Sequence, residues 1–325
     1  MNAGKSKLTL ILTLTAFLLV AAACSSSSTG SSPGSTSAPA GNPSTDKLVA
    51  ILARGTLILS TDPAYPPASF AVKGAVRAAN TKCASNELTA PEIDGYDAAT
   101  GKAVAAALGV EPCFVSPTWT AITGGNWGDR WDVSWGSGGI NADRMTRLYM
   151  TQPYYRTPQA YFVQKHSTYQ TPADLNGKRI GVCSACSHQL YLEGNLVVPG
   201  EEIVPTVKDP KIVVFDTEEA GLPTVADGKI DAFLCSEPIG VSFIDQGLAL
   251  RELKQPGFQL DLTGFIDKSS SLDQRAFVAR VNETILSLIA DGTLPAASEK
   301  YFGTDYATAA AAFNMDAIGQ TVTAP

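Results

Sequence analysis

Histidine is scarce in this chain, and positive charge is not in excess. Only His166 and His188 occur among the 325 residues, which argues against a histidine-rich metal site or a proton-shuttling enzyme. There are 24 basic and 31 acidic residues, and without Lys5 and Lys7 of the N-terminal segment the formal net charge is −9. Because phosphate binding needs a basic stripe, we expect no nucleic-acid partner.

Long hydrophobic runs are also missing beyond the first 23 residues. The run from Leu8 to Ala23 is shorter than the roughly 20 apolar residues of a membrane span. Hydrophobic residues make up 45% of the chain and charged residues 17%, which is ordinary for a globular protein. At this length we expect two domains of about 100 to 150 residues, and we find no repeat of solenoid period.

The N-terminal segment has the features of an export signal. Two lysines precede the apolar run, which ends in Ala21, Ala22, Ala23 and Cys24. This end resembles the lipobox of bacterial lipoproteins, so we expect residues 1–23 to be a signal peptide and Cys24 to carry lipid. Ordinary secretory cleavage, with a free Cys24, is the alternative. Residues 24–45 are rich in Ser, Thr, Gly, Pro and Ala, which predicts a flexible tether.

The remainder alternates between strand and helix patterns. We expect strands over residues 56–61, 110–115, 131–135, 160–164, 179–182, 212–215 and 230–234, and helices over 47–53, 98–108 and within 273–302. Such alternation predicts an α/β fold with mainly parallel sheets flanked by helices. The proline-rich segment 62–67 follows the first strand, at the end of a sheet where α/β proteins place ligands.

Several short motifs, each weak alone, occur together in one order. They are Gly55–Leu57 with Thr61–Pro67, Asp94–Asp97, Ile140–Arg144 with Gln152–Tyr154, Asp174–Val182, Gly228–Ala232, and Asp291–Leu294 with Lys300–Gly303. In this order and spacing the chain resembles the bacterial extracellular solute-binding proteins of family 3. The resemblance implies a two-lobed type II periplasmic-binding-protein fold, with lobe 1 at 46–156 plus 267–325, lobe 2 at 157–266, and a two-strand hinge near Tyr155 and Ile266.

The resemblance also implies how a ligand carboxylate would be bound. Arg144 lies after a glycine-rich loop, where the family has its carboxylate-binding arginine, and a planar guanidinium suits bidentate pairing. A surface salt-bridge arginine is the alternative. Further ligand contacts are expected from the loop and from the start of a second-lobe helix, at Ser137, Gly139, Ile140, Cys186 and Ser187.

Aromatic and acidic residues at family positions complete the expected site. Trp119 and Tyr65 would form the pocket walls, although a buried tryptophan also suits a core. Asp62 matches an acid that faces the ligand, although an aspartate before proline also begins turns. Many relatives carry an aspartate for the α-ammonium where this chain has Ser236, and we expect Glu237 to replace it if its side chain turns inward.

The cysteines predict disulfides in an exported protein. Cys83 and Cys113 would join an insertion to lobe 1, and Cys183 and Cys235, which end neighbouring predicted strands, would form a second bridge. Cys186 would then remain unpaired. A redox pair of Cys183 with Cys186, or a soft-metal site with His188 and Cys235, is a less favoured alternative.

The function implied by the resemblance is the substrate-binding component of an ABC importer. It would bind an amino acid or related small carboxylate between the lobes and deliver it to a membrane permease, as a monomer without catalysis, cofactor or metal. A lipid anchor would hold it at the outer face of the cytoplasmic membrane. The alternatives are a dehydratase-like enzyme on the same fold, or a receptor that presents its ligand to a membrane sensor. Ser137 lacks a G-x-S-x-G setting, which argues against an enzyme.

Overall fold

The structure is a computed structural model that describes residues 42, 43 and 45–320. All of these belong to one compact unit, Pro39–Pro325. The expected signal peptide, Cys24 and the tether up to residue 41 lie outside the described residues.

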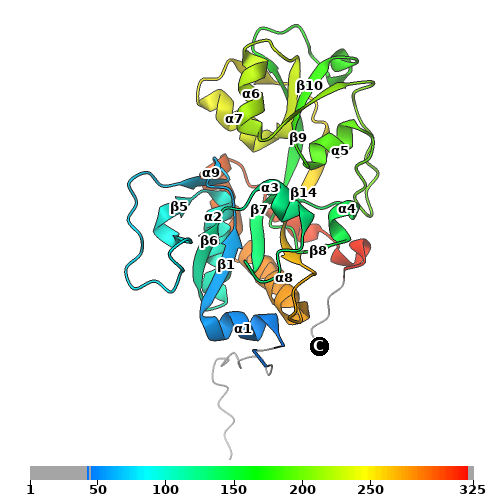
Figure 1. The fold of residues 1–325 in the computed structure, drawn as a ribbon. Coiled ribbons are helices and arrows are strands. Elements are labelled where there is room, and N and C mark those ends of the chain that lie inside the picture. Colours follow the sequence, from blue (N-terminus) through cyan, green and yellow to red (C-terminus); the bar gives the residue numbers. More distant parts are fainter. Residues whose placement is uncertain (1–41, 44, 321–325) are drawn as a thin grey trace, which may run out of the picture. The chain divides into compact units, whose positions relative to one another are not determined.

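One part of the main sheet is built around strand β1 (Figure 1). Strand β1 runs parallel to β6 and β7, which lie on either side of it. We call this part, with its flanking helices, the β1 side. Its strands are β1 (Thr56–Ser60), β4 (Leu88–Thr89), β6 (Glu111–Val115), β7 (Val133–Gly139) and β8 (Leu148–Met150). Its helices are α1 (Lys47–Arg54), α2 (Tyr96–Ala107), α3 (Trp119–Gly124), α4 (Ala142–Met145), α8 (Arg275–Ala290) and α9 (Thr293–Phe302).

The other part of the sheet is built around β10, which runs parallel to β11 and β12. We call it, with its flanking helices, the β10 side. Its strands are β10 (Arg179–Cys183), β11 (Lys211–Phe215), β12 (Ala232–Ser236) and β13 (Leu250–Glu252). Its helices are α5 (Ser187–Leu192), α6 (Glu218–Ala226) and α7 (Glu237–Asp245).

Two long antiparallel strands, β9 (Tyr155–Gln164) and β14 (Phe258–Asp267), connect the two sides (Figure 1). Strand β9 pairs with β12, and β14 pairs with β7, so the eleven strands form one continuous sheet. Helices α8 and α9 pack against α2 on the β1 side. The expected lobe limits fall within or at the end of β9 and β14, and the lobe assignment stays a prediction.

Short segments lie outside the main sheet, most of them on the β1 side. Strands β2 (Ala64–Tyr65), β3 (Ser69–Ala71) and β5 (Ile93–Asp94) form a small second sheet. Single 3-10 turns occur at η1 (Ala90–Glu92), η2 (Pro172–Leu175), η3 (Thr308–Ala312) and η4 (Met315–Ile318), of which η2 belongs to the β10 side. The small sheet fixes the segment after β1, which faces the site described below.

Local sequence explains where the elements begin and end. The carboxylate of Asp46 accepts a hydrogen bond from the Val49 amide and caps α1, and Gly55 ends that helix with a φ of 75°. The expected strands are present with ends shifted by a few residues. One shift matters, because residues 136–139 continue β7 instead of forming a loop. A side chain at Gly138 would overlap the ring of Phe265 on β14, so glycine permits this pairing.

Residues 45–320 contain two disulfides, and one differs from expectation. Cys83 is bonded to Cys113, and Cys183 is bonded to Cys186. The expected bridge between Cys183 and Cys235 is therefore wrong, and Cys235 is a buried, free cysteine. Cys235 packs in an apolar cluster with Phe162, whereas the turn after β10 brings Cys186 back to Cys183 with a Cα–Cα distance of 5.5 Å.

Candidate functional site

A pocket lies where strands from both sides of the sheet end. The segments after β1, β10, β11 and β12 all contribute to its walls, as expected for an α/β protein. Its lining residues are Thr61, Asp62, Tyr65, Pro117, Trp119, Ile122, Gly136, Ser137, Gly139, Arg144, Gln159, Cys183, Cys186, Ser187, His188, Asp216, Thr217, Glu218, Glu219, Ser236, Leu260 and Leu262.

One end of the pocket is formed by Arg144, which is 2% exposed. Its guanidinium donates to the carbonyl oxygens of Gly139 at 2.7 Å and Ala185 at 2.8 Å. The same group lies over the rings of Trp119 and Phe265, at 5.1 and 5.5 Å from their centroids. Burial lowers the pKa of Arg144 to about 10, so it is charged at neutral pH. Within residues 45–320 no carboxylate lies within 4.0 Å of this guanidinium.

Another part of the pocket wall is acidic and is centred on Glu218 at the start of α6. Glu218 is 4% exposed, and its carboxylate accepts a hydrogen bond from the Tyr65 hydroxyl at 2.8 Å. Burial, and then the charge of Glu219, raise the pKa of Glu218 to about 8, although the Tyr65 hydrogen bond opposes this. Glu219 also has a raised pKa because of burial, with a smaller contribution from Asp62. Among the described residues Glu219 Oε1 has no hydrogen-bond partner.

His188 lies beside this acidic part of the wall and is neutral. It is 6% exposed, and burial lowers its pKa to about 3. Gln159 Nε2 donates to the carbonyl oxygen of Thr157 at 3.0 Å, which turns Gln159 Oε1 toward the imidazole. Since an amide oxygen only accepts, His188 Nε2 carries the proton in its 2.6 Å contact with that oxygen. His188 Nδ1 therefore has a free lone pair.

Nine of the residues expected at a ligand site line this one pocket. They are Asp62, Tyr65, Trp119, Ser137, Gly139, Arg144, Cys186, Ser187 and Ser236. Asp62 also caps a turn, because its carboxylate accepts a hydrogen bond from the Ala64 amide at 2.8 Å. The hydroxyl of Ser236 is hydrogen-bonded to that of Thr157 at 2.9 Å.

Two expected backbone donors are already used within the protein. The amide of Ile140 donates to the Asp261 carbonyl at 3.2 Å, and its side chain is fully buried away from the pocket. The amide of Ser137 donates to the Tyr154 hydroxyl at 3.0 Å. Ser137 lies in β7 and Ile140 follows it directly, so these amides have partners within the fold, and ligand contacts at both residues stay predictions.

Glu237 does not turn inward, so the condition under which we expected it to replace the family's aspartate is not met in this structure. Its carboxylate accepts a hydrogen bond from the Tyr306 hydroxyl at 2.9 Å and does not line the pocket. Glu218 is the buried acid instead, and sequence reasoning missed it. Thr217, Glu218 and Glu219 follow a predicted strand, but an acid at a helix start is common because it complements the helix dipole. The pattern therefore contained only a weak signal.

The fold and this cleft define a class of two-lobed binding proteins, and comparison with known sequences places the chain within it. Residues 57–304 match the profile of bacterial extracellular solute-binding proteins, family 3, so the chain belongs to this family. Among the described residues, no helix has the length and apolar character that a membrane span requires.

Individual relatives are distant but cover most of the chain. The L-cystine-binding protein TcyJ of Escherichia coli (strain K12) is 25% identical over 260 residues, which cover 78% of this chain and 84% of that protein. ABC transporter arginine-binding protein 1 of the same strain is 24% identical over 215 residues, 65% of this chain and 82% of that protein.

A solved structure shows the same fold. The ancestral amino-acid-binding protein AncCDT-1, a precursor of cyclohexadienyl dehydratase, superposes with a TM-score of 0.62 at 23% identity. The match covers 79% of this chain and 100% of that one. The expected type II periplasmic-binding-protein fold is thereby confirmed.

Proposed function

We propose that this chain is the substrate-binding component of an amino-acid ABC importer and that its ligand is an α-amino acid with a cationic side chain. The observation that carries the proposal is that a buried arginine and a buried glutamic acid line one pocket. Among the described residues the Arg144 guanidinium donates to the carbonyl oxygens of Gly139 and Ala185 and to the Ser187 hydroxyl, and no carboxylate pairs with it. The Glu218 carboxylate accepts a hydrogen bond from the Tyr65 hydroxyl, and no arginine or lysine pairs with it. Since a buried charge without a counter-charge is costly, each residue favours a ligand group of the other sign.

The charges define which ligand group goes where. A ligand carboxylate would pair with Arg144, and the α-ammonium would pair with Glu218 once that carboxyl has lost its proton. Asp62, Asp216 and Glu219 also line the pocket, which contains no lysine and no arginine other than Arg144. This surplus of acid favours a ligand with a second positive group, as in arginine or lysine. Trp119 and Tyr65 would flank the ligand's carbon chain.

The ligand would also link the two sides of the sheet. Arg144 follows β7 on the β1 side, whereas Glu218 begins α6 on the β10 side. A ligand that contacts both Arg144 and Glu218 binds most tightly when the two sides of the sheet are close together, and it therefore stabilises that closed arrangement. A permease can then recognise the surface of the closed protein. A lipid on Cys24 would keep the protein, as a monomer, next to its permease at the outer face of the membrane.

A ligand panel tests the proposal. The protein would be unfolded, freed of bound ligand, refolded and titrated by calorimetry with arginine, lysine, citrulline, glutamine, glutamate and cystine. We expect saturable binding of arginine or lysine and at least about tenfold weaker binding of citrulline, which has arginine's shape without its charge. Equal affinity for citrulline would contradict the cationic side chain, and failure of every amino acid would contradict the proposed function.

Lipid anchoring has a separate test. Cells expressing the full chain would be labelled with a fatty acid, and a Cys24→Ala variant would be the control. We expect label on the unaltered chain alone. An unlabelled, secreted product would show that Cys24 is not the anchor.

An enzyme on the same fold is the second candidate, and one observation favours it. With a pKa of about 8, Glu218 is protonated at neutral pH and has the properties of a general acid for a dehydration. The same panel, extended to small hydroxycarboxylates, would be followed for product by mass spectrometry. Turnover that disappears in Glu218→Gln would establish the enzyme, whereas binding without turnover supports the transport role.

A further inference from the structure

The disulfide between Cys183 and Cys186 lies in the wall of the candidate pocket. Cys183 ends β10 and is 4% exposed, and Cys186 precedes α5 and is half-buried. Both residues line the pocket. Cys186 also lines a second hollow, together with Arg147 and Gln189. Cys186 is therefore the more exposed residue of the two.

While this disulfide is intact, no group among the described residues donates a hydrogen bond to Nδ1 of His188. Its Nδ1 lone pair faces Cys183 Sγ at 3.8 Å and Glu218 Oε1 at 3.9 Å. A disulfide sulfur carries no proton, and the Glu218 oxygen is beyond hydrogen-bonding distance. Reduction would give Cys183 an S–H group aimed at this nitrogen, so the buried imidazole gains a partner only in the dithiol form.

The disulfide also closes a turn that is part of the site. Ala185 lies inside the turn with a φ of 57°, a left-handed conformation that is unfavourable for alanine. Its carbonyl oxygen accepts hydrogen bonds from Arg144 Nη2 at 2.8 Å and from Trp119 Nε1 at 3.3 Å. Opening the disulfide removes the covalent constraint on this turn, and its relaxation would release both side chains of the carboxylate end.

We propose that Cys183 and Cys186 are a redox-active pair that exchanges with an external dithiol and thereby sets the affinity of the pocket for its ligand. The oxidised form is the high-affinity form. The effect on affinity rests on the proposed amino-acid function, whereas the exchange itself does not.

The exchange is balanced with a dithiol as the reductant. One thiolate of the dithiol attacks Cys186 Sγ, the bond between the two protein sulfurs breaks, and its electron pair goes to Cys183 Sγ, which takes a proton. The second thiol of the reductant then attacks the mixed disulfide and releases Cys186 as a thiol. The protein gains two electrons and two protons, and the reductant becomes a cyclic disulfide.

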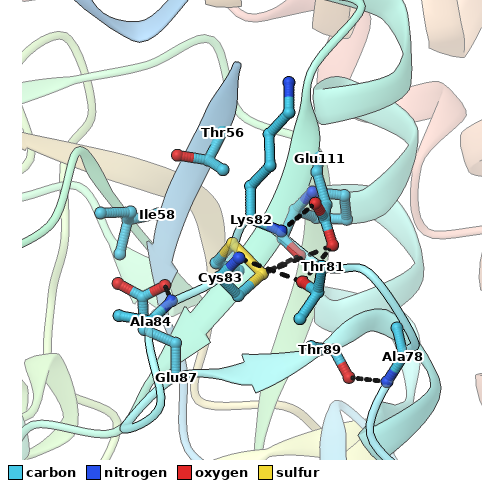
Figure 2. Close-up of a disulfide and its surroundings, with 12 residues drawn as sticks. Thr56, Ile58, Ala78, Thr81, Lys82, Cys83, Ala84, Glu87, Thr89 and Glu111 are labelled. Carbon is cyan, nitrogen blue, oxygen red and sulfur yellow. Dashed lines mark hydrogen bonds between the residues drawn. A yellow bond between two sulfur atoms is a disulfide. The ribbon is translucent and has the colours of Figure 1, made fainter. Parts of the chain in front are cut away.

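The other disulfide is an internal control (Figure 2). Cys83 and Cys113 are 30 residues apart and join the 71–92 insertion to β6. Both are buried, and neither lines the pocket. Figure 2 shows Glu111 bonded to the segment around Cys83, where it accepts a hydrogen bond from the Lys82 amide at 2.9 Å. This segment is therefore held by the fold as well as by its disulfide.

The first experiment measures which disulfide opens. The full folded chain would be equilibrated with increasing dithiothreitol, alkylated, and analysed by mass spectrometry of its peptides. We expect alkylation of Cys183 and Cys186 at concentrations that leave Cys83 and Cys113 bonded. Simultaneous opening of both disulfides, or earlier opening of Cys83–Cys113, would overturn the proposal.

The role of His188 has its own variant. His188→Phe keeps a ring of similar size but removes the acceptor, so the dithiothreitol concentration that half-opens Cys183–Cys186 should rise severalfold. His166→Phe changes an exposed histidine and is the control. An unchanged midpoint in His188→Phe would show that the S–H to Nδ1 contact does not favour the dithiol.

The second experiment measures arginine affinity in the oxidised protein, in the selectively reduced protein and in the double variant Cys183→Ser, Cys186→Ser. We expect the last two to bind about tenfold more weakly, a typical size for coupling between sites. The double variant Cys83→Ser, Cys113→Ser, if folded, should bind like the oxidised protein. Equal affinity in all forms would overturn the coupling. If no form binds any amino acid, the proposed function fails, while selective opening would still establish the exchange.

Discussion

Arg144 and Glu218 are buried in the wall of the same pocket, but burial affects their charges differently. Burial leaves Arg144 charged, because its pKa of about 10 is still well above neutral, but it leaves most Glu218 protonated, because that pKa is about 8. Arg144 is thus a permanent charge, and Glu218 becomes charged when a cation arrives. In the proposed complex the carboxylate contact is therefore preset, whereas the ammonium contact is coupled to loss of a proton.

The largest effect on ligand affinity is expected at Arg144, which is charged throughout the neutral pH range. Arg144→Ala should weaken arginine binding by at least about 100-fold, which corresponds to about 2.7 kcal/mol, because it leaves the ligand carboxylate buried without a partner. Arg147→Ala removes a partly exposed arginine that pairs with Asp143 and is the matched control. Calorimetry would measure both variants. A loss of similar size in Arg147→Ala would show that net charge, and not the buried contact, determines affinity.

A smaller effect is expected at Glu218, which is charged only after it loses a proton. Glu218→Gln should weaken arginine binding by about 10- to 100-fold, since the amide keeps the shape but cannot become an anion. Glu237→Gln is the control, because Glu237 bonds to Tyr306 away from the pocket. Titration of both variants with arginine tests the assignment. A large loss in Glu237→Gln with none in Glu218→Gln would restore the ammonium role expected from the sequence.

Arg144 could be predicted from the sequence, whereas Glu218 could not. Arg144 lies in one of the family motifs and Trp119 at a family position, so the resemblance alone predicts that both line the pocket. The order of strands and helices is predictable for the same reason, together with the periodicity of apolar residues. Element ends are not, as at residues 136–139, where pairing with β14 extends a strand through glycines.

The burial of Glu218 depends on a contact that no local pattern encodes, whereas the Cys183–Cys186 pair is visible in the sequence as an alternative. Glu218 becomes a buried acid because α6 begins beside Tyr65, which is 153 residues away in the chain. The choice between Cys186 and Cys235 as the partner of Cys183 depends on the direction of side chains after β10, and neighbouring strands alone do not determine it. Long-range packing thus decides the burial of Glu218, whereas the direction of a local turn decides the disulfide.

Proton coupling distinguishes Glu218 from Arg144 further. A bound ammonium stabilises the Glu218 carboxylate and lowers its pKa from about 8, so binding below pH 8 releases a proton. Arginine affinity should therefore fall as pH drops from 8 to 6, by up to tenfold per unit. The nearby groups that face Glu218 are Tyr65, His188, Glu219 and the disulfide sulfur of Cys183.

Calorimetry in two buffers of different ionisation enthalpy would count the released protons. In Glu218→Gln both the proton release and most of the pH dependence should disappear. If the pH dependence persists unchanged in that variant, another group titrates with ligand binding, and the conditional charge is not Glu218.

The smallest effect is expected at Glu219, which is half-buried in the acidic part of the pocket wall. Glu219→Gln should weaken arginine binding by about three- to tenfold and leave glutamine binding unchanged, because it removes only the partner of the ligand's side-chain charge. Partial exposure screens this interaction, so the difference should shrink further in about 1 M salt. Glu193→Gln, an exposed acid on the same side, is the control. Equal losses for arginine and glutamine would instead place Glu219 at the α-ammonium, and the two acids of α6 would then share one role.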